Sequence, residues 1–208
     1  MKEKIHKFWN NLAPTCTNMV LHKGIESYDQ AEQEEILALL PNFKNKRVLE
    51  IGAGIGRFTG HLAESASCVN AIDLASHFLK KNQKVHKRLT NIDYICCDAR
   101  DLCYPEETFD FIFINWLFLY FDDQEVTSYL CNLHAWLKPG GYLFLRESCF
   151  HDVREYQRED YVAIYRFQSE YHLALETIFS IEKWGMIETY IHYRNLPNQF
   201  YWLCQKKG

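Results

Sequence analysis

The sequence lacks an apolar run long enough to cross a bilayer. Its very apolar stretch 111–121 is too short for a membrane span and contains Asn115. Residues 2–4 are all charged, so we expect no apolar segment of a secretory signal at this end. We therefore expect a cytoplasmic protein that has no membrane span.

An excess of positive charge is also missing. The 208 residues carry a formal net charge of −4, and the isoelectric point is about 6.1. Residues 80–88 hold the one basic cluster, which we interpret as the solvated face of a helix. Proteins that bind nucleic acid usually show a basic stripe or patch. We therefore expect a small-molecule substrate and no nucleic acid.

Metal-ligand and disulfide patterns are absent as well. The eight cysteines include no C-x-x-C pair, and the nine histidines show no ligand spacing. Several cysteines fall in or beside strand-like segments, where reduced thiols serve as small apolar residues. We expect no metal site and no disulfide framework.

Glycine is scarce, but three of the nine glycines stand on alternate positions, 52, 54 and 56. They follow an apolar strand that begins at Arg47 and precede a helical pattern over 57–63. A dinucleotide fingerprint needs glycine at its sixth position, and here that position is Arg57. The form Glu50-x-Gly52-x-Gly54-x-Gly56 instead resembles motif I of class I S-adenosylmethionine-dependent methyltransferases. The alternatives are a site for another nucleotide and a purely structural turn.

Polar residues stand at the ends of the next strand-like segments. Asp73 ends segment 68–73, where a carboxylate meets ribose hydroxyls in Rossmann-type folds; the alternative is a cap for the helix that starts at Ala75. Asp98 and Ala99 follow the strand that starts at residue 92, where we expect the adenine. Asn115 follows the apolar strand 109–114.

Strand and helix signals alternate as far as residue 148, which predicts a mostly parallel sheet. A helix is expected to end at Leu137, with residues 138–141 as a stop and turn. Two further strands are expected over 177–184 and 200–205. We divide the single domain into an N-terminal helical cap, a cofactor-binding core, a substrate cap and C-terminal strands, which correspond to residues 1–45, 46–148, 149–178 and 179–208.

Three segments together resemble the phosphoethanolamine N-methyltransferases, with the best match to the plant enzymes. They are residues 52–59, residues 115–117 with Tyr120, and the run Arg-Glu-Ser-Cys-Phe-His at 146–151. The resemblance covers nearly the whole chain. It implies an α/β, Rossmann-like class I fold with helices on both faces of a seven-stranded sheet whose last strand is antiparallel. It also implies methyl transfer from S-adenosylmethionine to phosphoethanolamine or a related phosphobase, towards phosphocholine in phospholipid metabolism.

The resemblance also implies site residues. Motif I adds three cofactor contacts to those that the family match carries over, and together these are Glu50, Gly52, Gly54, Gly56, Arg57, Asp73, Asp98, Ala99 and Asn115. The family holds the substrate phosphate with the pattern Y-x-x-x-R-x-Y. Here Tyr165 and Tyr171 match the two tyrosines, but Ser169 replaces the arginine. We expect Arg166 and Arg194 to supply the missing charge.

The catalytic candidates are Tyr120 and His151, with Trp116 and Ser148 as further substrate contacts. Tyr120 is expected to orient the acceptor amine, although a buried core tyrosine is an equally simple reading. Two other functions stay open: a methyltransferase for another small amine or acid, and a catalytically silent cofactor-binding partner protein. These patterns do not predict how many methyl groups are transferred or the oligomeric state. They also do not predict whether the chain is part of a longer two-domain protein.

Overall fold

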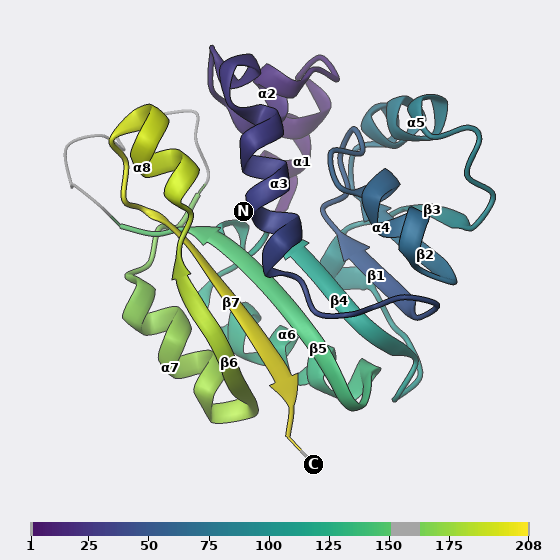
Figure 1. Cartoon of the computed structure of the whole chain (residues 1–208), viewed down its shortest axis with the longest axis vertical. Helices are drawn as coiled ribbons and strands as arrows, with labels where there is room; N and C mark the ends of the chain where they lie inside the picture. The colour runs from purple at the N-terminus through teal and green to yellow at the C-terminus, as the bar shows by residue number, and fades with distance from the viewer. Residues whose placement is uncertain (1, 151–162, 208) are drawn as a thin grey trace.

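The computed structural model describes residues 2–150 and 163–207, and these residues surround one seven-stranded sheet (Figure 1). The strand order is β3-β2-β1-β4-β5-β7-β6, and β7 is antiparallel to both of its neighbours. The expected fold class, a mostly parallel sheet with an antiparallel last strand, is confirmed. The strands are β1 (Arg47–Ile51), β2 (Cys68–Asp73), β3 (Ile92–Cys96), β4 (Phe109–Asn115), β5 (Leu137–Ser148), β6 (Phe179–Met186) and β7 (Gln199–Lys206).

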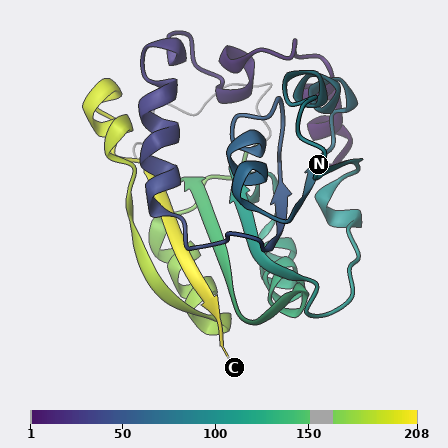
Figure 2. The same ribbon diagram turned by 45° about the vertical axis from the view of Figure 1, so that its right-hand side comes forward.

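Helices cover both faces of this sheet, as expected (Figures 1 and 2). One hydrophobic cluster joins the sheet to α3 and α4, and the other joins it to α6 and α7. The helices are α1 (Lys2–Asn10), α2 (Cys16–Val20), α3 (Asp29–Leu39), α4 (Thr59–Ser65), α5 (Ser76–Val85), α6 (Asp123–Trp136), α7 (Gln168–Ile178) and α8 (Glu188–Arg194); three short 3₁₀ turns are η1 (Ile25–Ser27), η2 (Ala99–Asp101) and η3 (Phe118–Tyr120).

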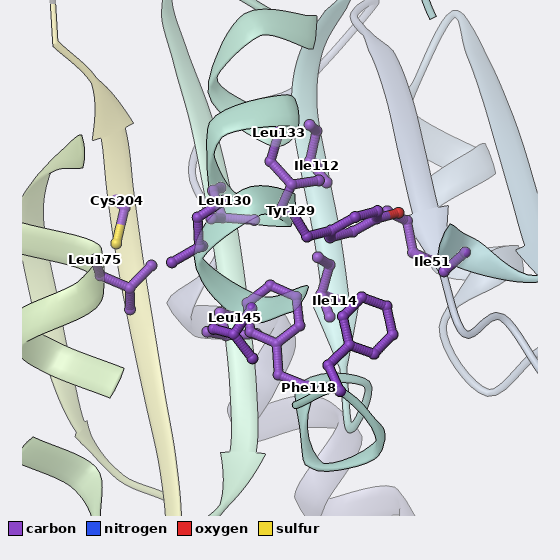
Figure 3. Close-up of a cluster of buried hydrophobic side chains, with 14 of the residues drawn as sticks. Ile51, Ile112, Ile114, Phe118, Tyr129, Leu130, Leu133, Leu145, Leu175 and Cys204 are labelled. Carbon is purple, nitrogen blue, oxygen red and sulfur yellow. The ribbon is translucent and has the colours of Figure 1, made fainter. Parts of the chain in front are cut away.

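The apolar strand β4 shows why the sheet needs cover on both sides. Successive side chains of a strand point to opposite faces. Phe111 and Phe113 accordingly enter the cluster on the α3 and α4 side, whereas Ile112 and Ile114 enter the cluster with α6 and α7. Figure 3 shows the second cluster between the sheet and these helices. A continuously apolar strand therefore marks a central position, as its sequence indicated.

The expected stop and turn at residues 138–141 is wrong in one respect, because these residues belong to β5. Leu137 pairs with Phe109, and the next pair joins Tyr142 to Phe111, so the extra residues form an irregularity within the strand. Gly140 adopts a φ of 72° there, which glycine accommodates without strain. The proline and glycines thus produce a bulge rather than the end of an element.

The expected substrate cap at 149–178 is also different in its described part. Helix α7 packs against α6 and against β6 and β7 below the sheet, with Tyr171 and Leu175 buried in the core. Burial of its apolar stripe makes it a core helix.

Residue His151 lies outside the described residues. None of the helices in residues 2–150 and 163–207 combines the length and apolar character that crossing a membrane requires.

Candidate active site

A cavity of about 420 Å³ lies where β1, β2, β4 and β5 end. This is the side of a doubly wound sheet on which ligands bind, and the volume is within the roughly 300–1,000 Å³ of small-molecule sites. Nine of the predicted site residues line it together: Gly52, Asp73, Ala99, Asn115, Trp116, Tyr120, Ser148, Tyr165 and Arg194.

The glycine loop forms one end of the cavity. Gly52 lines it with a φ of 82°, a conformation that residues with a Cβ rarely adopt. The Gly54 N–H lies 2.9 Å from Oδ2 of Asp73, and a Cβ on Gly54 would lie 2.0 Å from Cε of Met19. Gly56 faces away from the cavity, towards the Asn82 side chain. A close approach of a ligand to the loop is therefore possible mainly at Gly52.

Asp73 lies at the end of β2, and its carboxylate bonds to backbone groups on two sides. Its Oδ1 accepts a hydrogen bond from the Ala75 N–H at 2.8 Å, and its Oδ2 accepts the bond from Gly54, so it orders both the loop and the start of α5. The carboxylate also lines the cavity. Burial raises the pKa of Asp73 to about 6, although these two backbone donors oppose the shift. A ligand hydroxyl that reached Asp73 would find an acceptor of fixed orientation.

Glu50 lies beneath the loop and does not line the cavity. Its Oε2 accepts a hydrogen bond from Thr59 Oγ1 at 2.6 Å, and Asn82 Nδ2 donates to the same hydroxyl at 2.8 Å. All three side chains are buried. Burial raises the pKa of Glu50 to about 8, although the Thr59 bond opposes the shift. Its contribution is therefore to the packing under the loop.

Glu50→Gln should stabilise the protein increasingly as the pH rises. A carboxyl whose pKa is raised by folding contributes most below its unfolded pKa, and the contribution is lost as the pH passes the folded value, here about 8. The loss is on the order of 4 kcal/mol, and the neutral amide avoids it. Thermal melts at pH 5 and pH 9 test this: the gap between variant and wild-type Tm should widen by several degrees. A gap that stays constant would show that Glu50 does not titrate in this range.

Arg57 does not line the cavity, in contrast to its expected role as a cofactor contact. Its guanidinium pairs with Asp29 at 2.6 Å and with Oε2 of the fully buried Glu32 at 2.5 Å. Oε1 of Glu32 accepts a second ion pair, from Arg146 at 2.7 Å. The Nε and Nη2 donors of Arg57 are occupied because two carboxylates of α3 meet its guanidinium as the helix packs on the sheet.

Arg146 links this buried network to the cavity wall. Its guanidinium carbon lies 3.5 Å from the ring centroid of Trp116, and its Nη1 donates to Oδ1 of Asn115 at 3.1 Å. Trp116 has a φ of 60°, which is unusual for a bulky residue. Cation–π contact and hydrogen bonding thus support a strained wall position.

Asp98 also has protein partners where a ligand contact was expected. It pairs with His6 of α1 at 2.8 Å, and it accepts hydrogen bonds from the backbone and side chain of Arg100. Burial opposes ionisation, but these donors hold the pKa of Asp98 below its ordinary value. Its neighbour Ala99 does line the cavity.

The other end of the cavity gathers polar and aromatic side chains from β4, β5, β7 and α8. Oε1 of Gln199 accepts hydrogen bonds from Trp116 Nε1 at 2.9 Å and from Ser148 Oγ at 3.0 Å. Tyr120 and Tyr165 line the same region. Gln199 therefore fixes two of the predicted substrate contacts relative to each other.

Arg194 is the one cationic residue among those that line the cavity in the described part of the chain. Most other residues of the expected phosphate site lie elsewhere, and so does Ser169. Arg166 is buried against backbone carbonyls, Tyr171 packs on Trp202 with centroids 5.7 Å apart, and Ser169 is exposed on α7. The spacing that resembles the family's phosphate pattern brings only its first tyrosine to the cavity.

Several lining residues were not identified from the sequence, and much of the roof comes from the N-terminal segment. Trp9 contacts both Tyr120 and Phe78 edge to face. Tyr190 of α8 borders the cavity, and Glu35 of α3 accepts hydrogen bonds from the first backbone N–H groups of that helix. No periodicity marks such residues, because long-range packing alone brings them here. The further roof and wall residues are Met19, Val20, Leu21, Leu119, Leu196 and Asn198.

A metal centre has no visible basis in residues 2–150 and 163–207, where no group of three or more potential ligand side chains gathers. The expectation of a metal-free site stays a prediction. The cavity is lined by hydroxyl, amide and aromatic groups, with one carboxylate and one guanidinium. These groups suit an organic zwitterion better than a metal ion.

Comparisons with known proteins match this geometry. Residues 48–141 match the family model of a methyltransferase domain. A wheat phosphoethanolamine N-methyltransferase 1 is 34% identical to this chain, over 99% of this chain and 45% of the relative. The Arabidopsis thaliana phosphoethanolamine N-methyltransferase 1 is 36% identical, over 92% of this chain and 42% of the relative. The chain thus spans about half the length of the curated relatives it matches.

A solved structure agrees with these relatives. Haemonchus contortus phosphoethanolamine N-methyltransferase 1, determined with phosphoethanolamine and S-adenosylhomocysteine, superposes with a TM-score of 0.92 at 32% identity. The superposition covers 98% of this chain and 48% of that one. Nearly the whole chain is therefore similar to phosphoethanolamine N-methyltransferases, as its motifs indicated, and it contains a methyltransferase domain.

Proposed function

We propose that this chain transfers methyl groups from S-adenosylmethionine to the nitrogen of phosphoethanolamine or of its partly methylated forms. The observation that carries the proposal is a single cavity with two chemically distinct ends. Gly52 and Asp73 form the end suited to an adenosyl amino acid, and Tyr120, Ser148, Tyr165 and Arg194 form the end suited to an anionic amine. The structure of the Haemonchus contortus relative contains these two kinds of ligand.

The residues fit S-adenosylmethionine at the glycine-loop end. Asp73 presents an acceptor to ribose hydroxyls, and Ala99 with the apolar residues Leu74 and Phe78 suits a flat adenine ring. When bound, the cofactor supplies the methyl group for an in-line displacement. Glu50, Gly54 and Gly56 then contribute by shaping the loop, whereas Arg57 and Asp98 act through their ion pairs rather than as ligands.

At the acceptor end, the nitrogen of the bound substrate must be a neutral amine. An alkylamine is largely protonated near neutrality, as lysine is. Tyr120 and the aromatic wall would orient and desolvate the nitrogen, and most of the rate should come from that orientation. General-base assistance is a smaller contribution. His151, which lies outside the described residues, remains a proposed second catalytic group.

A methyltransferase for a different small amine or acid is the second candidate. Ser169 stands where the family has an arginine, and it is exposed on α7, so Arg194 is left as the cation of the described cavity. Labelled S-adenosylmethionine offered with phosphoethanolamine, its mono- and dimethyl forms, and the unphosphorylated amines separates the two. We expect transfer to the phosphorylated series; equal transfer to ethanolamine would favour the second candidate.

Arg194→Ala should raise KM for phosphoethanolamine by about tenfold to a hundredfold, because a charge-assisted contact is worth roughly 1.5–3 kcal/mol. The phosphate lies away from the reacting nitrogen, so kcat should change little. Steady-state kinetics with phosphoethanolamine and with the unphosphorylated amine measure the effect, and only the former should respond. A wild-type KM in the variant would mean that no phosphate is held at Arg194.

The cytoplasmic location, the absence of a nucleic-acid partner and the four-part division of the domain also remain proposals. The first two are supported by the acidic net charge of −4 and by a reaction between small, water-soluble molecules. The division stays a proposal apart from α7, which lies in the core.

A further inference from the structure

Residues 117–121 form the loop that carries Tyr120 between β4 and α6, and charged side chains hold its backbone. Leu117 N–H and Phe118 N–H both donate to Oε1 of Glu147, at 2.7 and 2.6 Å. Glu147 is fully buried at the end of β5. One carboxylate thus satisfies the amide groups at the start of the loop.

The carbonyl groups of the same loop are satisfied mainly by two arginines. Arg166 donates from Nη1 to the Phe118 carbonyl at 3.1 Å and from Nη2 to the Phe121 carbonyl at 2.7 Å. Arg100 donates from Nη2 to the Tyr120 carbonyl. The Leu119 carbonyl accepts from the Ile164 N–H at 2.6 Å, and that of Leu117 from the Tyr120 N–H at 3.0 Å. Every carbonyl from 117 to 121 therefore has a donor.

Arg166 is held in this position by more than the two carbonyls. It is 6% exposed, its Nε donates to Asp123 at 2.8 Å, and its guanidinium lies 5.7 Å from the ring centroid of Tyr171. Turning it towards the cavity would leave two backbone carbonyls without their charged donor, which is costly in a buried setting. Arg166 is therefore bound to the loop and is not free to bind a substrate phosphate.

The loop is anchored from its apolar side as well. Phe118 is fully buried and lies in the cluster with Ile114 and Leu145 (Figure 3). Tyr120, two residues further on, belongs to the same cluster and also lines the cavity. Fixing the backbone on both sides of Tyr120 sets where its ring and hydroxyl point.

We propose that Arg166 is a positioning residue for Tyr120: it clamps the Phe118 and Phe121 carbonyls and so fixes Tyr120 against the methyl acceptor. This assignment rests on the proposed function in taking Tyr120 as the group that orients the acceptor amine. Misplacing a reacting or orienting group by about 1 Å can cost on the order of a hundredfold in rate. The role explains why Arg166 is buried although the sequence predicted a phosphate ligand.

Arg166→Met and Arg166→Lys test the assignment, with Arg88→Met as a control for the loss of an exposed positive charge. In the methionine variant we expect kcat to fall by about tenfold to a hundredfold, while KM for phosphoethanolamine stays within about twofold. Affinity for S-adenosylmethionine, measured by calorimetry, should not change. The lysine variant can still donate to one carbonyl, so its kcat should lie between that of wild type and that of the methionine variant. If the methionine variant does not fold, the lysine variant tests the proposal alone.

Each variant is also made in a Tyr120→Phe background. If Arg166 acts through Tyr120, the loss of kcat should be much smaller there, because the hydroxyl that it positions is already gone. An equal loss in both backgrounds would overturn the proposal. So would a selective rise in KM for phosphoethanolamine, which would make Arg166 a phosphate ligand.

The acceptor question is settled separately on wild type. If wild type methylates ethanolamine but not phosphoethanolamine, the proposed acceptor is wrong, and the same coupling between Arg166 and Tyr120 is then measured with ethanolamine. Retained coupling there would support the positioning role, and its absence would overturn it.

Discussion

Asp73→Ala is expected to reduce the affinity for S-adenosylmethionine by about a hundredfold or more. Two hydrogen bonds from ribose hydroxyls to a carboxylate are worth roughly 1.5–3 kcal/mol each. The variant also loses the bonds to the Gly54 and Ala75 N–H groups, so the glycine loop would no longer be held at the cavity. Isothermal titration calorimetry measures the affinity directly.

Asp93→Ala provides the matched control, because Asp93 is an exposed carboxylate on the neighbouring strand β3. It removes the same charge without touching the cavity, so its affinity should equal that of wild type. Circular dichroism should show that both variants keep their secondary structure. Wild-type affinity in Asp73→Ala would remove this carboxylate from the cofactor site.

Glu32→Ala is expected to lower the free energy of unfolding by about 3–5 kcal/mol, the usual cost of removing one partner from a buried ion pair. Glu32 is fully buried, and it is shared by Arg57 and Arg146. Without Glu32, both guanidinium groups stay in the interior with less negative charge to balance them. The loss should also loosen Trp116, which packs under Arg146 at the cavity wall.

Urea unfolding at constant pH measures this change, with Glu34→Ala as the comparison. Glu34 is exposed on the same helix and bonds only to the nearby Gln30 side chain among the contacts described for it. Its removal should shift the free energy of unfolding by no more than about 0.5 kcal/mol. Similar values for the two variants would mean that the buried network contributes little to stability.

The approximate place of the cavity was predictable because parallel strands bring their carboxyl ends to one edge of the sheet, whereas the family was predicted from the resemblance of three segments. Residues at the carboxyl ends of the parallel strands are therefore expected near the ligand site, although Asp98 after β3 does not line the cavity. Asp73 was identified on that basis, whereas Gly52 came from the glycine motif and Asn115 from the family resemblance; all three line the cavity. Local patterning was sufficient here, since it fixes both the strand and the residue that ends it.

The bulge at 138–141 and the helix α7 could not be predicted in the same way. Proline and glycine mark a break in regular geometry, but pairing with β4 and β7 decides whether the strand ends or only bends. The tyrosines near residue 170 suit either a cap or a core helix. Burial against β6 and β7 places Tyr171 in the core.

The sequence by itself determined the strand–glycine loop–helix unit, the order of the strands along the chain and the residues at the strand ends. Only the tertiary structure decided which charges meet. Glu32 contacts Arg146 across 114 positions of sequence, and Arg166 contacts the Phe118 carbonyl across 48. An arginine is attracted to whichever carboxylate or carbonyl lies near it, and packing of distant elements sets that distance. For that reason Arg57 and Arg166 resembled ligands in the sequence, yet in the folded chain they bind the protein itself.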